Sequence, residues 1–138
     1  MRYLIALVFC LMMVSAQVHA CRDPNSWDMV FFETIPNPQP DADMIAKVSL
    51  SDVNEEMNTA TVTAIATVIQ VLKTSDARVH EGDKIAMKYR FTSCGPDHKN
   101  GDQGTIIAKT GSDINGRPML YPYMHNFRGR ITLPSLSE

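Results

Sequence analysis

Much of the chain alternates between apolar and polar side chains with a period of two, which is the pattern of a half-buried β-strand. The alternation is clearest over residues 84–91, where we predict a strand with its apolar face towards a core. The apolar face carries Ile85, Met87, Tyr89 and Phe91, and the opposite face carries Lys84, Lys88 and Arg90. Solubility explains such a basic face, which is also a candidate anion-binding stripe.

Two longer segments upstream show the same period. Residues 42–50 place apolar side chains on one face, and the polar residues 51–58 that follow predict a turn. Residues 59–73 carry threonines on one face and valines and alanines on the other, which is typical of a long, strongly bent strand. Residues 74–83 are polar and predict a connection to the next strand.

Two short strands are predicted downstream, over residues 105–110 and 119–123. Between them, Asn115-Gly116 is a dipeptide that favours a tight hairpin turn. Prolines within the second of these segments confine it to an edge or a bulged position, because proline cannot donate a ladder hydrogen bond.

The segment before the first strand shows a different spacing. Trp27, Val30 and Phe31 recur as on one side of a short helical turn, for which Asn25 or Ser26 could act as the cap. Proline then follows at every second position from Pro36 to Pro40, which favours an extended spacer.

Five strands within about 80 residues predict an all-β fold, and we expect a small five-stranded antiparallel OB-like barrel, closed or partly closed. An irregular N-terminal segment precedes the barrel, and a C-terminal tail, residues 124–138, carries no strong period. A two-sheet sandwich has the same local signals and is the structural alternative. The length suits one domain, and a composition of 44% hydrophobic and 20% charged residues excludes a disordered chain.

Residues 1–20 have the features of a signal peptide: a short positive start, an apolar run over residues 4–14, and small residues Val18 and Ala20 before the cut. Cleavage there leaves residues 21–138 as a single domain in the periplasm or outside the cell. The apolar run is short for an uncleaved membrane anchor. A lipoprotein anchored through Cys21 is an alternative that His19 disfavours. We expect no transmembrane segment after signal removal.

The mature chain retains two cysteines, Cys21 and Cys94, because Cys10 leaves with the signal. An even number in an oxidising compartment favours a disulfide, which would close a loop of about 73 residues and add roughly 4 kcal/mol of stability. Two unpaired buried thiols are the alternative. Lipidation of Cys21 would exclude the bond.

Charge argues against a nucleic-acid partner, because the chain has no global basic field. Residues 21–83 carry 4 basic and 11 acidic side chains, whereas residues 84–138 carry 8 basic and 4 acidic. The fold could therefore present two faces of opposite sign, although strand pairing is more apt to interleave them.

The sequence contains no HExxH, GxSxG or paired metal-ligand motif, so we predict no catalytic residues, no metal site and no cofactor. The mature histidines, His80, His98 and His125, are scattered and predicted to lie at the surface. Cys94 and His98 have a zinc-ligand spacing without a second pair. Tyr121, Tyr123 and Phe127 are candidate ligand contacts, or they close the end of the barrel.

Six short landmarks follow one another over residues 21 to about 123. They are Cys21 at the mature start, residues 42–48 (ADMIAKV), 71–73 (VLK), 82–85 (GDKI), 91–95 (FTSCG) and 104–108 (GTIIA). In this order they resemble the netrin-like (NTR) domain and, within that group, the N-terminal domain of the tissue inhibitors of metalloproteinases (TIMPs). The resemblance implies an OB fold and a disulfide between Cys21 and Cys94.

The inhibitors also have a second bond from a cysteine two residues after the first. This chain has Asp23 there, and Tyr123-Met124 near the expected partner position. If the resemblance extends to activity, the free amine and carbonyl of Cys21 would chelate the catalytic zinc of a target protease. The implied inhibitory ridge is Cys21, Arg22, Ser93 and Cys94. Arg22 stands where the inhibitors prefer a small or hydroxylated residue.

The function we predict is that of an exported, non-enzymatic binding or accessory module. Its expected partner is an extracytoplasmic protein or a glycan. The alternative is a metalloprotease inhibitor that acts through the N-terminal Cys21. An enzyme is the third class and has the least support in the sequence.

Overall fold

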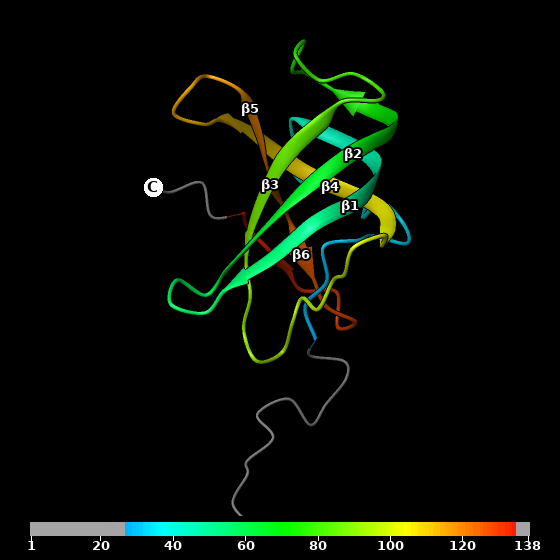
Figure 1. The fold of residues 1–138 in the computed structure, drawn as a ribbon. Coiled ribbons are helices and arrows are strands. Elements are labelled where there is room, and N and C mark those ends of the chain that lie inside the picture. Colours follow the sequence, from blue (N-terminus) through cyan, green and yellow to red (C-terminus); the bar gives the residue numbers. More distant parts are fainter. Residues whose placement is uncertain (1–26, 135–138) are drawn as a thin grey trace, which may run out of the picture.

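The computed structural model describes residues 27–134, and its secondary structure is all β. Strands β1 (Met44–Glu56) and β2 (Thr61–Thr74) form a long hairpin across the front of the molecule (Figure 1). The other strands are β3 (Lys84–Arg90), β4 (Gln103–Ser112), β5 (Pro118–Pro122), β6 (Met124–His125) and β7 (Ile131–Thr132). The prediction of an all-β fold is confirmed.

Strands β1 to β5 close into a barrel in the order β1-β2-β3-β5-β4, and β4 completes the ring by pairing with β1. The pairs are antiparallel except for β3 and β5, which run parallel, with Ala86 opposite Met119 and Met87 opposite Leu120. The predicted five-stranded barrel is confirmed, although its strands are mixed rather than all antiparallel. Strand directions cannot alternate around a closed ring with an odd number of members, so a five-stranded barrel needs a parallel pair.

The barrel interior is filled by apolar side chains from every strand. On β3, Ile85, Met87 and Tyr89 are buried, as their alternation predicts. The bulkiest fully buried side chains of the interior include Met44, Leu50, Met87, Ile106 and Leu120. A small barrel packed in this way leaves its outer surface and its ends for binding.

The first hairpin is longer than predicted. A turn was expected over residues 51–58, but β1 continues to Glu56 and the turn lies between Met57 and Ala60. The register shifts between Ser51 and Asn54, where Asp52 has a positive φ of 51°. This bulge preserves the strand pairing, and the polar side chains beyond it project into solvent.

The segment that precedes the barrel is extended, so the helical turn predicted from Trp27, Val30 and Phe31 is wrong. The apolar side chains of this segment belong to two clusters: Val30 is buried in the barrel core, and Phe32 packs against the outside of the sheet. Isolated bridges tie the segment to the barrel, Met29 to His125 and Phe32 to Thr105. The predicted caps, Asn25 and Ser26, lie outside the described residues. Residues 35–40 contain neither helix nor strand, as their prolines require.

A second apolar cluster lies on the outer face of the barrel. It consists of Phe32, Ile45, Ile107 and Tyr123, and Ala42 and Ile131 pack against it. The Tyr123 hydroxyl donates a hydrogen bond to the Asp41 carbonyl at 2.7 Å. The cluster explains why Ile45 and Ile107 are buried although they point away from the interior.

The C-terminal region contains a small sheet that the sequence pattern missed. Strands β6 and β7 pair antiparallel, with Met124 opposite Thr132 and His125 opposite Ile131. Asn126 and Gly129 form the turn: the Asn126 side chain accepts two backbone hydrogen bonds, and Gly129 has a positive φ of 74°. Asn and Gly at this spacing are the signal that would have predicted the hairpin.

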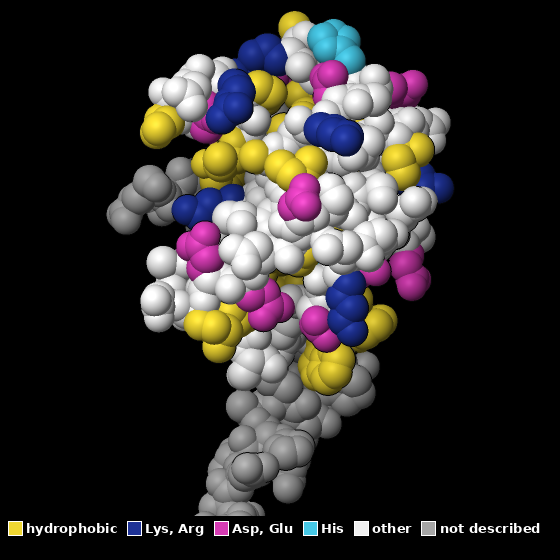
Figure 2. Space-filling model, in the orientation of Figure 1, with side chains coloured by type: hydrophobic (Ala, Val, Ile, Leu, Met, Phe, Trp, Pro, Cys, Tyr) yellow, Lys and Arg dark blue, Asp and Glu magenta, His cyan; other side chains and the backbone are white. Residues whose placement is uncertain are grey.

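Charges of both signs lie interspersed on the face of the molecule in Figure 2. Charges from the two halves of the sequence also pair directly, since Lys109 lies 2.9 Å from the Asp41 carboxylate and 3.6 Å from the Asp43 carboxylate. Within residues 27–134, no helix has the length and apolar character needed to cross a membrane.

Candidate functional site

The turn that follows β3 holds two of the residues predicted for the inhibitory ridge, Ser93 and Cys94. Cys94 is half-buried and Ser93 is exposed. Thr92 and Gly95 pair across the turn, and the Asp28 amide donates a hydrogen bond to the Cys94 carbonyl at 2.9 Å. The other two ridge residues, Cys21 and Arg22, lie outside the described residues, so their position beside Cys94 stays a prediction.

A hollow of about 330 Å³ lies beside this turn, and we call it the Cys94 hollow. Trp27, Met57 and Phe91 supply its apolar side chains, while Glu55 and Asp97 supply carboxylates. The end of the β1–β2 hairpin therefore stands next to Cys94 and the start of the described chain.

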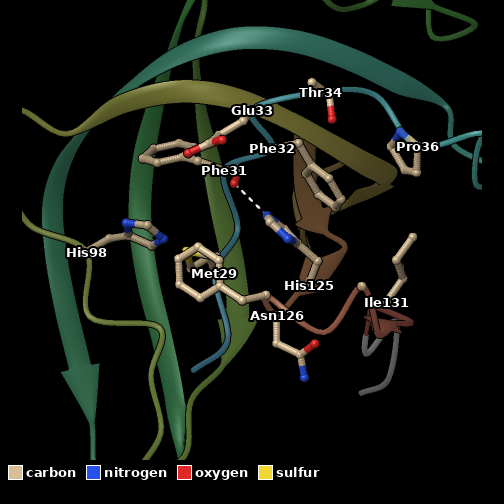
Figure 3. Close-up of a pocket in the computed structure, with 12 residues that line it drawn as sticks. Met29, Phe31, Phe32, Glu33, Thr34, Pro36, His98, His125, Asn126 and Ile131 are labelled. Atoms are coloured by element: carbon tan, nitrogen blue, oxygen red, sulfur yellow. Dashed lines mark hydrogen bonds between the residues drawn. The ribbon is translucent and has the colours of Figure 1, made fainter. Parts of the chain in front are cut away.

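A second and more apolar concavity, the aromatic pocket, has a volume of about 460 Å³ and lies between the N-terminal segment and the β6–β7 sheet (Figure 3). Its apolar walls are Met29, Phe31, Phe32, Pro36, Phe127 and Ile131. Glu33, Thr34 and Asn126 add polar groups. Phe127, one of the apolar walls, remains 63% exposed.

Two histidines from different elements enter the aromatic pocket (Figure 3). His98 comes from the loop between β3 and β4, and its ring lies 4.6 Å from that of Phe31. His125 comes from β6, and its ring stacks on Phe32 at 4.2 Å. The prediction that the histidines are surface residues is wrong for His98, whose side chain is only 12% exposed.

The two imidazoles hold the N-terminal segment by opposite hydrogen-bonding roles. The Val30 amide donates to Nε2 of His98 at 3.3 Å, so this nitrogen must carry a lone pair. Nε2 of His125 lies 2.6 Å from the Phe31 carbonyl oxygen, which can only accept, so this nitrogen must carry a proton. The neutral tautomer of each ring is therefore assigned by its partner.

Burial sets the electrostatics of this end of the barrel. It lowers the pKa of His98, although Asp102 and Asp97 act in the opposite direction. It raises the pKa of Tyr89, whose ring meets the His98 ring edge-on, and Glu55 adds to that rise. The buried Tyr89 hydroxyl has no hydrogen-bond partner among the described residues. Burial also raises the pKa of Asp28, against the effect of Arg130.

The other candidate residues do not converge on one site. Lys84, Lys88 and Arg90 share the outer face of β3, and none of them lines either concavity. Of the three aromatic candidates, Phe127 lines the aromatic pocket and Tyr123 is buried in the outer cluster. The ring of Tyr121 packs close to Gly111.

Among residues 27–134, no group of three or more His, Cys, Asp or Glu side chains is placed to hold a metal ion. Cys94 and His98 lie on the same loop but line different concavities. The two concavities at this end of the barrel differ in character: the aromatic pocket is apolar and contains two imidazoles, whereas the Cys94 hollow is edged by carboxylates.

Comparison with known proteins returns no matching family model, no matching curated protein and no matching solved structure. The resemblance to NTR domains and TIMPs therefore stays a prediction.

Proposed function

We propose that this protein is an exported, non-enzymatic binding module with a TIMP/NTR-like OB fold, and that it binds its ligand in the aromatic pocket. The observation that carries the proposal is an apolar concavity of about 460 Å³ at the end of a barrel whose interior is filled. Ligand sites are mostly apolar concavities with a few polar groups that fix orientation. The aromatic pocket has this composition.

The apolar lining favours a partner that inserts apolar side chains, and we infer an extracytoplasmic protein. A glycan would need more hydrogen-bonding groups for its hydroxyls than these walls supply. Neither concavity combines a nucleophile, a base and an oxyanion site, which is why we assign binding to this end of the barrel.

A neutral fluorescent probe, N-phenyl-1-naphthylamine, tests the pocket. The probe should bind the wild-type protein, and Phe127→Ala should weaken its binding about tenfold, because it removes one aromatic wall. Phe127 is mostly exposed, so its truncation should leave the fold intact. The matched control is Ile114→Ala, at a fully exposed side chain in the β4–β5 turn. Equal affinity in both variants would reject the aromatic pocket as the site.

The second candidate function is metalloprotease inhibition through Cys21. Its support is the Asp28–Cys94 hydrogen bond, which brings the chain to within seven residues of Cys21 beside the turn that carries Ser93 and Cys94. Cys94 is a half-cystine, which supports the predicted pairing with Cys21. A disulfide at this position would hold the Cys21 amine for chelation, and Arg22 would contact the protease.

Extension of the mature chain separates the two candidates. One alanine added before Cys21 converts the α-amine into an amide and should abolish any inhibition of a zinc protease. The same extension should leave probe binding in the aromatic pocket unchanged. Inhibition that survives the extension would exclude the zinc-chelating mechanism.

A further inference from the structure

His98 fastens one wall of the aromatic pocket to the barrel. Its Nε2 accepts the Val30 amide hydrogen, and its ring packs against Phe31. Val30 is fully buried in the barrel core, and the next side chain, Phe31, lines the pocket. The position of this wall therefore depends on a lone pair on His98.

Protonation of His98 removes that lone pair. A protonated Nε2 carries a hydrogen that would face the Val30 N–H, so an attractive contact becomes a repulsive one. The imidazolium would also be charged within a nearly buried site. The Val30 contact must then break and the ring must move.

The groups that face His98 act on its protonation in opposite directions. On its own loop, Asp102 lies 3.5 Å from Nδ1, and Asp97 also favours the charged form. On β3, the uncharged Tyr89 phenol faces the His98 ring. The N-terminal segment contributes Val30 and Phe31 at the contact and Glu33 elsewhere in the pocket, and β6 contributes His125. Burial outweighs the carboxylates, so the pKa of His98 lies below the usual value of 6.5.

His125 makes a second hydrogen bond to the N-terminal segment, and in this bond the ring nitrogen donates rather than accepts. Its Nε2 donates to the Phe31 carbonyl, and a protonated ring donates equally well. Acidification should therefore break the His98 contact and preserve the His125 contact. We therefore expect the hydrogen bonds of the two histidines to respond differently to acidification, although both residues line the same pocket.

We propose that His98 is a pH-sensitive latch of the aromatic pocket, which holds ligand while His98 is neutral and releases it when His98 is protonated. The inference rests on the proposed function, because it concerns regulation of that same pocket. It assigns the protein a partner that is bound near neutral pH and released in an acidic medium.

The test measures the affinity of N-phenyl-1-naphthylamine, which stays uncharged, at about pH 7.5 and about pH 5. The wild-type protein should lose about five- to tenfold in affinity on acidification, the range set by one hydrogen bond. His98→Gln places an amide oxygen near the position of Nε2 and cannot be protonated, so its affinity should not change with pH. His125→Gln can still donate to Phe31 and should keep the wild-type pH dependence.

The outcomes separate the latch from the pocket itself. No binding at either pH would reject the proposed function, whereas binding with no change between the two pH values would reject only the latch. A pH dependence that persists in His98→Gln would also overturn it. NMR of the wild-type protein gives a check that needs no variant: the Val30 amide resonance and the His98 ring nitrogens should titrate with one midpoint. Separate midpoints would contradict the latch.

Discussion

Two glycines at the pocket end of the barrel are required by close contacts. A Cβ on Gly95 would lie 2.9 Å from the Asp28 carbonyl oxygen, and Gly95 also has a positive φ of 96°. A Cβ on Gly104 would collide with the ring of Phe31. Gly104 therefore lets the N-terminal segment lie directly on β4, and this position forms a wall of the aromatic pocket.

Gly104→Ala should lower the free energy of unfolding by about 1–3 kcal/mol, the usual cost of overpacking a fitted contact. Denaturant unfolding measures the loss. The added Cβ would meet both the Cβ and the ring of Phe31, so Gly104→Ala should cost much less in a Phe31→Gly background, which removes both. Equal costs in both backgrounds would show that the strain lies elsewhere.

Single residues also show why the sequence did not predict the aromatic pocket. His98 and His125 belong to no recognisable sequence motif. Their rings pack against Phe31 and Phe32, which lie more than 60 residues away in the sequence. Phe127 belongs to a segment without periodicity. Nothing local indicates that these side chains meet, whereas Cys94 was identified because it is one of only two cysteines expected in the mature chain.

At the scale of elements, alternation predicted the strands well where a strand packs on one core. The inner face of β3 and the Val and Ala face of β2 are buried as expected. Alternation failed where a second layer covers the barrel: Ile45 and Ile107 are buried on the outer side by Phe32 and Tyr123. The N-terminal segment was misjudged for the same reason, since its hydrophobic residues serve two clusters.

Arg78 anchors the connection between β2 and β3 to the end of β4, at the end of the barrel away from the aromatic pocket. Its guanidinium lies 2.6 Å from the Asp76 carboxylate and 2.9 Å from the Ser112 hydroxyl, at the end of β4. The hydrogen bond from Arg78 holds the pKa of Asp76 well below its usual 3.8. A predicted polar connection thus has a specific anchor, which its composition did not reveal.

Because the folded protein lowers the pKa of Asp76, this carboxylate stabilises the fold above pH 3.8 and loses that effect as the pH falls below it. Asp76→Asn should therefore lower the free energy of unfolding by about 1 kcal/mol at neutral pH. The difference from wild type should be smaller at about pH 2.5 than at neutral pH, because the unfolded chain then binds a proton that the folded chain does not yet bind. Urea unfolding at both pH values measures it, and a difference that stays constant would contradict the ion pair as its source.

At the scale of the whole molecule, closure of the barrel accounts for the one departure from the predicted fold class. Five strands and their approximate order along the chain can be deduced from period-two segments, but pairing partners cannot. Closure of five strands requires a parallel pair, which in this structure is β3–β5. The start of the described chain, the β3–β4 loop and the β1–β2 turn lie at one end of the barrel, where both concavities are found (Figure 1).

A disulfide between Cys21 and Cys94 would tie the mature N-terminus to that same end. In the chain-entropy model, closing a loop of about 73 residues adds roughly 4 kcal/mol to the free energy of unfolding. Reduction should remove this stabilisation, and the intact mass of the mature protein should rise by about two hydrogens. Cys94→Ala should be as unstable as the reduced protein and should not respond to reductant.

The same mass measurement distinguishes the functions that remain open. A mature chain that begins at an oxidised Cys21 keeps the zinc-chelating mechanism available, because it provides a free α-amine fixed beside Ser93 and Cys94. A lipidated Cys21, or a start at another residue, eliminates that mechanism. The walls of the aromatic pocket lie within residues 29–131, so the pocket does not depend on the state of Cys21. Probe binding by a protein with a modified N-terminus would therefore support the binding module and exclude the inhibitor.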